Sequence, residues 1–172
     1  MEKYDPGKLN NRFAHLANNS VQKYNSKKPN EAIETDSMWS KEQFKEWVVA
    51  QYGEGRLKEI VARMKEIVVA SIIATQDQVQ GRRNSFELIG YDFMIDRDLN
   101  PWLIEVNSSP SMDYSTAVTR RLVKMVSEDT IKVVVDARQK KSRKKTAGLF
   151  RLIYDGETKY NFKYYRKQYD AE

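Results

Sequence analysis

The sequence predicts an α+β fold in which helices pack against an antiparallel sheet. Residues 57–72 carry apolar side chains at helical spacing, which is typical of a helix with one buried face. Residues 86–96 and Pro101–Asn107 are instead rich in aromatic and branched side chains and predict two strands. Only the turn-like residues 97–100 separate them, and a connection this short joins antiparallel neighbours.

Composition bounds the class of protein. The 172 residues, 40% of them hydrophobic, suffice for one domain with a core. No run approaches the roughly 18 apolar residues of a membrane helix, and no signal-peptide core is visible. The absence of cysteine excludes disulfides and thiolate metal sites. We expect a soluble intracellular protein. Its net charge of +6 favours an anionic partner: nucleic acid, acidic lipid, nucleotide or an acidic protein tail.

The elements before the hairpin follow from local patterns. Residues 12–17 predict a short strand. Ser40 and Gln43 form a capping box that begins a helix. Gly53 and Gly55 end it, and a second helix follows to about Gln76. Its apolar stripe consists of Leu57, Ile60, Val61, Met64, Ile67, Val68, Ser71 and Ile72.

The elements after the hairpin are shorter. Residues 108–115 form a loop, and a third helix follows, marked by Val118, Leu122, Met125 and Val126. Residues 131–136 are either its end or a short strand, because periodicity does not separate the two. Residues 148–154 predict a last strand.

The hairpin register brings two carboxylates together. Symmetrical pairing around the turn places Asp92 opposite Glu105 and Asp96 opposite Pro101. Facing carboxylates repel, so the pair requires a bound cation or a protonated partner. Large apolar neighbours predict limited solvent access for both carboxylates: Tyr91, Phe93, Ile104 and Val106.

A third oxygen ligand lies beside this pair. Asn107 is two residues beyond Glu105 and therefore projects from the same face. Two carboxylates and one amide oxygen, without His or Cys, suit Mg²⁺ or Mn²⁺. Because Mg²⁺ completes its shell with water and phosphate, the set points to a nucleotide. The alternative is an ordinary solvated acidic hairpin, and a register error of one residue would separate the side chains.

Two separated segments carry a family resemblance. Residues 86–96, 101–107 and 108–112 closely resemble the tubulin–tyrosine-ligase-like family, whose fold is an ATP-grasp, and His15–Asn18 is similar to its upstream "HLTN" segment. The resemblance covers roughly residues 10–136. It implies the C-terminal part of an ATP-grasp fold over residues 1–136, followed by a basic, aromatic extension over residues 137–172.

The resemblance also assigns site residues. It implies that Asp92, Glu105 and Asn107 hold a catalytic magnesium, with Mn²⁺ as a substitute. The Thr-Asn pair of "HLTN" touches the nucleotide in the family. Here that pair is Ala17 and Asn18, so the amide carries over and the hydroxyl is missing. No residue is assigned as catalytic.

Within the family, residues 19–23, 108–112 and 128–136 look most like the glycylase branch. Such enzymes use ATP to phosphorylate glutamate γ-carboxylates in tubulin tails, and a glycine amine then displaces phosphate. The resemblance therefore implies ATP, Mg²⁺, glycine and tubulin or microtubules as partners. It also implies a cytoplasmic, cytoskeletal location such as the axoneme of a cilium or flagellum. Membrane binding is not expected.

The length limits what this chain does alone. An ATP-grasp ligase also needs an adenine-binding hinge, phosphate-binding lysines, a substrate-carboxylate arginine and a lid, for which 172 residues leave no room. We expect the C-terminal half of a longer enzyme, inactive by itself.

Other functions remain open. A family ligase adding glutamate or tyrosine would share these motifs. A non-catalytic microtubule- or acidic-tail-binding module would use the basic side chains of residues 138–145. The tyrosines and basic residues of 159–169 resemble a single-stranded nucleic-acid surface, but no RNA-binding signature accompanies them. His15, the only histidine, is expected to be a hydrogen-bonded strand residue.

Overall fold

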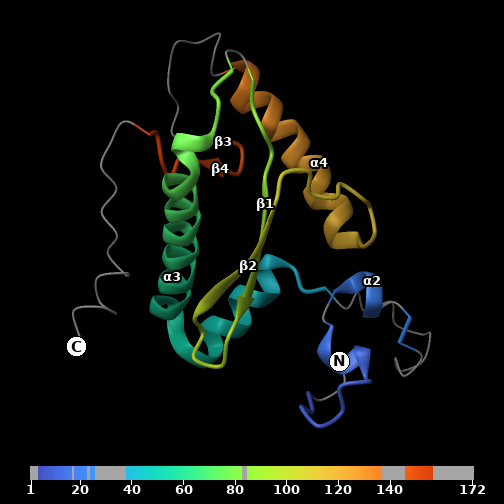
Figure 1. The fold of residues 1–172 in the computed structure, drawn as a ribbon. Coiled ribbons are helices and arrows are strands. Elements are labelled where there is room, and N and C mark those ends of the chain that lie inside the picture. The colour runs from blue at the N-terminus through green and yellow to red at the C-terminus, as the bar shows by residue number, and fades with distance from the viewer. Residues whose placement is uncertain are drawn as a thin grey trace.

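A computed structural model describes residues 4–16, 18–22, 24–25, 38–82, 85–136 and 146–156. One long helix, α3 (Lys41–Thr75), lies along the hairpin formed by β1 (Gly90–Ile95) and β2 (Pro101–Asn107). Helix α4 (Ala117–Ile131) lies on the other side of the hairpin. The short helices α1 (Arg12–His15) and α2 (Asn19–Gln22) lie near the lower end of the hairpin (Figure 1). Helices and an antiparallel two-stranded sheet confirm the predicted α+β class.

Helix α3 begins as its sequence predicts and bends at a glycine. The Gln43 amide donates to Ser40 Oγ at 3.2 Å, and the Ser40 amide donates to Gln43 Oε1 at 2.8 Å. Gly53 adopts the non-helical angles φ 81° and ψ 166°, so α3 consists of two helical segments that meet at a kink, and the predicted break at this glycine is confirmed. Gly55 already belongs to the second segment. A 3-10 turn at Gln76–Gln78 follows α3.

The hairpin contains an irregularity that symmetrical pairing did not predict. Asp92 pairs with Glu105 as expected, but Phe93 pairs with Leu103, which leaves Ile104 as the extra residue of a β-bulge. The register beyond the bulge is shifted by one residue. Ile95, not Asp96, therefore pairs with Pro101, and the expected pairing of Asp96 was wrong. Strand β1 also begins later than predicted, at Gly90.

Asp96 organises the turn instead. Its carboxylate accepts hydrogen bonds from the Asn100 amide at 2.8 Å and from Trp102 Nε1 at 2.9 Å. The bonds from Trp102 and from the Asn100 backbone lower the pKa of Asp96. The turn is also tied to α3, because the Arg56 guanidinium donates to the Asp98 carbonyl.

One apolar side chain of the turn, that of Leu99, packs into the core. Leu99 has φ 62°, a left-handed conformation that is uncommon for a branched residue, and it is only 6% exposed. It packs with Val48 and Ile60, one from each segment of α3. The bend at Gly53 therefore creates the corner that the hairpin tip fills. Partly buried side chains complete this cluster: Phe44, Leu57, Met64 and Ile95.

The strand expected at residues 12–17 is wrong. Arg12–His15 form the short helix α1, and Asn19–Gln22 form α2. The buried Gln22 side chain holds these turns together by donating from Nε2 to the carbonyls of Phe13 and Leu16, at 2.9 and 2.6 Å. His15 is hydrogen-bonded as expected, through Nε2 to the Lys8 carbonyl at 3.0 Å, but it lies in a helix.

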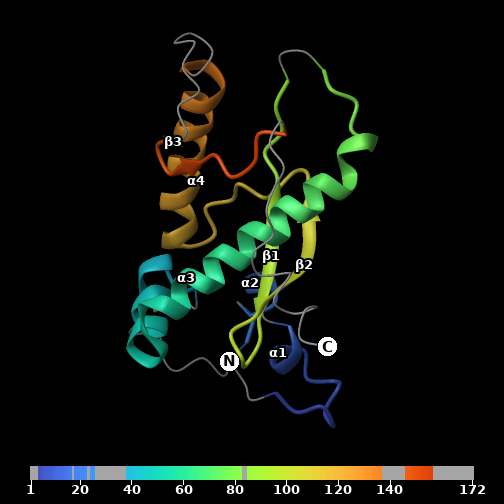
Figure 2. The ribbon, with the colours of Figure 1, turned by 90° about the vertical axis from the view of Figure 1, so that its left-hand side faces the viewer.

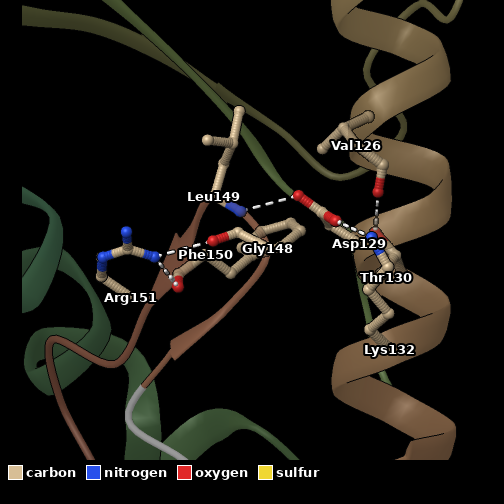
Figure 3. Close-up of polar contacts among 8 residues, drawn as sticks. All are labelled: Val126, Asp129, Thr130, Lys132, Gly148, Leu149, Phe150 and Arg151. Carbon is tan, nitrogen blue, oxygen red and sulfur yellow. Dashed lines mark hydrogen bonds and ion pairs between the residues drawn. The ribbon is translucent and has the colours of Figure 1, made fainter.

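Helix α4 continues into a π-helical turn, Lys132–Asp136, so residues 131–136 end the helix and are not a strand. The predicted last strand is reduced to β4 (Phe150–Arg151), which pairs with β3 (Thr146–Ala147). Asp129 joins this hairpin to α4 (Figure 3), because its carboxylate accepts from the Leu149 amide and from Lys132 Nζ, both at 2.7 Å. These contacts, that of Lys132 first, lower the pKa of Asp129.

Gly148 fits this junction for two reasons. Its φ of +59° belongs to the left-handed region, and a Cβ added there would clash with the Asp129 carboxylate. The structure therefore requires a residue without a side chain at the point where β3–β4 meets α4.

Trp39 and Trp47 pack against each other with ring centroids 6.1 Å apart, and they are 55% and 39% exposed, outside the core. Within the described ranges, no helix is long and apolar enough to cross a membrane.

Candidate metal site on the hairpin

The hairpin presents the predicted ligands on one face. Asp92 pairs with Glu105, and Asn107 pairs with Gly90, two positions along the same strands. Since alternate residues of a strand project to the same side, all three side chains share a face. Helix α3 crosses the hairpin (Figure 2).

The proximity of the two carboxylates affects the protonation of Asp92. Partial desolvation, a hydrogen-bonding contact with Glu105 and repulsion from its charge raise the pKa of Asp92. Asn107 Nδ2 donates to Glu105 Oε1 at 3.0 Å, so the amide lies within reach of the pair. A cation between the carboxylates would relieve their repulsion.

Solvent access differs from the expectation. Both Asp92 and Glu105 are exposed, so the limited access predicted from their apolar neighbours was wrong. The reason is that the flanking Tyr91 and Phe93 turn toward α3, while the carboxylates project from the opposite face. An open face leaves coordination positions free for water or phosphate, as Mg²⁺ requires.

The loop after β2 borders the site. Pro110 lies so close to Gly90 that a Cβ added to the glycine would be 2.9 Å from Pro110 Cβ and 3.9 Å from Asn107 Cβ. The Ser-Ser-Pro segment therefore folds back over the end of the hairpin next to Asn107. No side chain larger than that of glycine fits at position 90 without displacing this loop.

The donor set fits a hard divalent cation. It provides oxygen ligands alone, which is the preference of Mg²⁺ and Mn²⁺. Among the described residues, no group of three His, Cys, Asp or Glu side chains could hold a metal. The hairpin brings together two carboxylates and one amide, so the amide of Asn107 would have to be the third ligand.

The predicted nucleotide contacts lie apart from the hairpin in sequence. The carbonyl of Asn18 accepts hydrogen bonds from the amides of Val21 and Gln22, both at 3.0 Å, at the start of α2. The Asn18 side chain is exposed. Figure 1 shows α1 and α2 to one side of the hairpin. Ala17 lies outside the described residues, and so do residues 138–145 and 157–172, on which the expectations of a basic and an aromatic surface depend.

Sequence comparison identifies the family. The model of the tubulin-tyrosine ligase family matches residues 1–143, most of the chain and all of the hairpin. The chain belongs to the tubulin-tyrosine ligase family. This family is ATP-grasp-like, which confirms the resemblance seen in the motifs.

Several named proteins are similar in sequence to the chain. Tubulin glycylase 3B of Tetrahymena thermophila is 52% identical over 155 residues, covering 87% of this chain and 13% of the relative. Tubulin monoglycylase TTLL3 of Danio rerio is 43% identical over 143 residues, covering 81% and 18%. Protein monoglycylase TTLL8 of Mus musculus is 43% identical over 143 residues, covering 81% and 17%. The chain thus spans less than a fifth of the length of these relatives.

The raised pKa of Asp92 has a measurable consequence. Without divalent cations, Asp92→Asn is expected to raise the urea midpoint of the chain at pH 7, because it removes a repelling charge. Since the folded-state pKa is above the unfolded value, the penalty in the original chain is absent below about pH 4 and grows as pH rises through the folded pKa. Urea titrations in EDTA at pH 3.5 and 7 measure it. A lower midpoint for Asp92→Asn at pH 7 would contradict this origin of the shift.

Proposed function

We propose that this chain supplies the magnesium-nucleotide part of an ATP-dependent ligase that joins glycine to glutamate side chains of tubulin. The observation that carries the proposal is the pairing of Asp92 with Glu105 on an open hairpin face, with Asn107 beside them. The similarity to tubulin glycylases and protein monoglycylases supports glycine as the transferred amino acid.

In this proposal, the three side chains act as oxygen ligands. Asp92 and Glu105 provide two negative charges, and the Asn107 amide fixes the orientation of the Glu105 carboxylate through its 3.0 Å hydrogen bond. When bound there, Mg²⁺ supplies charge neutralisation at the β- and γ-phosphates of ATP. Asn18, and the position of Ala17, contribute to nucleotide binding.

The partners follow from the same assignment. The acceptor is the acidic C-terminal tail of tubulin, for which the net charge of +6 is favourable. We therefore place the full-length protein in the cytoplasm on microtubules, including those of cilia or flagella. Residues 1–136 form the ligase portion, and residues 137–172 form an extension whose basic side chains suit an acidic surface.

Amino-acid transfer by the full-length protein tests the proposal. With ATP and Mg²⁺, labelled glycine should enter tubulin, whereas labelled glutamate and tyrosine should not. Mass spectrometry of the tubulin tails then locates the added residue on a glutamate side chain. Transfer of glutamate or tyrosine would support the ligase activity but contradict the assignment of glycine as the transferred amino acid. Microtubule binding without any transfer would favour a non-catalytic module of the same family.

A further inference from the structure

A short series of hydrogen bonds lies behind the carboxylate pair and joins β1 to α3. The Tyr91 hydroxyl is 2.9 Å from Ser71 Oγ, and Ser71 Oγ is 2.8 Å from the Val68 carbonyl oxygen. A carbonyl only accepts, and a serine hydroxyl has one hydrogen. Ser71 therefore donates to Val68 and accepts from Tyr91, so the direction of both bonds is determined.

Tyr91 occupies the centre of the proposed ligand set. It precedes Asp92 in the chain, and its partner across the ladder is Val106, which lies between Glu105 and Asn107. Its ring also stacks on that of Phe93, with centroids 6.5 Å apart and planes inclined by 19°. Tyr91 and Phe93 are the residues directly before and after Asp92, and their rings lie on the face of the strand that points toward α3. The two rings therefore hold the backbone around Asp92 from that face.

The hairpin needs such an anchor at this place. The bulge between Asp92 and Phe93 interrupts the regular ladder immediately beside the carboxylates. Repulsion between Asp92 and Glu105 acts at the same pair of residues. Helix α3 has 35 residues and provides a fixed support against which one strand can be held.

We propose that Tyr91 and Ser71 are positioning residues that hold β1 at the spacing at which Asp92 and Glu105 bind one cation. The inference rests on the proposed metal site, and neither hydroxyl is a ligand itself. Partners that orient metal ligands directly affect affinity by about 10–100-fold. Because Tyr91 acts through the backbone of its neighbour, we expect a smaller effect.

Mn²⁺ binding to the 172-residue chain, measured by electron paramagnetic resonance, tests the inference. Tyr91→Phe and Ser71→Ala should each weaken Mn²⁺ affinity about three- to tenfold. The double variant should lose no more than either single variant, because both remove the same bond. Ser71→Thr retains the hydroxyl and should restore the affinity.

Two matched variants control for the loss of a hydroxyl. Ser127 Oγ donates to the Val123 carbonyl at 2.9 Å in α4, and the Tyr154 hydroxyl donates to Gln76 Oε1 at 3.1 Å. Ser127→Ala and Tyr154→Phe should leave Mn²⁺ affinity unchanged.

The failures of the two proposals are distinguishable. If Asp92→Ala leaves Mn²⁺ binding intact, the metal site itself is rejected. If Asp92→Ala abolishes binding while Tyr91→Phe and Ser71→Ala bind normally, the positioning inference alone is overturned. Circular dichroism under the assay conditions verifies folding. Should Tyr91→Phe unfold, the comparison of Ser71→Ala with Ser71→Thr decides the result.

Discussion

Asp92→Ala is expected to abolish the proposed ATP-dependent glycine transfer by the full-length protein while leaving its fold intact. The side chain is exposed, so its removal creates no cavity, and it also relieves the repulsion from Glu105. Loss of one of the two proposed charged ligands should reduce activity by more than about 100-fold, since mutation of the outer partners of metal ligands already reduces metal affinity or activity by about 10–100-fold. Labelled-glycine incorporation into tubulin measures the loss, and Glu105→Ala should behave alike.

Asp98→Ala is the matched control for this substitution. Asp98 is an exposed carboxylate in the turn of the same hairpin, and its contact with Arg56 uses the backbone carbonyl, which alanine retains. Its activity should equal that of the original protein. If Asp92→Ala retained activity, or if Asp98→Ala lost as much, the hairpin face would not be the metal site.

Leu99→Ala is expected to lower the free energy of unfolding by about 2–5 kcal/mol, because it empties the position where the turn enters the core. Leu99→Gly should be less harmful than Leu99→Ala, which reverses the usual order of these residues. At φ 62°, glycine avoids the cost of about 1–2 kcal/mol that a Cβ incurs in left-handed backbone. Urea unfolding of the three proteins measures both differences.

An exposed leucine serves as the control. Leu152 is 53% exposed, so Leu152→Ala should change the free energy of unfolding by less than about 0.5 kcal/mol. A larger loss for Leu99→Gly than for Leu99→Ala would show that the side chain outweighs the backbone conformation at this position.

Local patterns predicted the elements whose signals lie within a few residues. The capping box at Ser40 and the break at Gly53 both follow from nearby chemistry and were correct. The prediction for the region around Arg12 was wrong because the buried Gln22 side chain donates to the carbonyls of Phe13 and Leu16 and holds the segment as helical turns. A side-chain contact of this kind leaves no mark on the periodicity of the segment that it stabilises.

The candidate site was predicted only in part, and the correct part again depended on local pattern alone. Alternation placed Asp92 opposite Glu105 because strands repeat every two residues, and no distant contact enters that argument. The bulge at Ile104 was missed because the Asp96 network and the left-handed Leu99 determine the geometry of the turn. Exposure was misjudged because apolar neighbours in sequence occupy the opposite face of a strand. Ser71, a polar residue within an apolar stripe, was the visible sign of the contact to Tyr91.

The bulge divides the hairpin into two parts, and the register of one part does not depend on the register of the other. The pairing of Asp92 with Glu105 belongs to the part that runs toward Gly90, whereas the pairs from Phe93 onward belong to the turn. Deleting Ile104 would leave every observed pair in place and every side chain on its present face. Homologous hairpins can therefore gain or lose one residue at this point, and an alignment gap there would leave the carboxylates opposite each other.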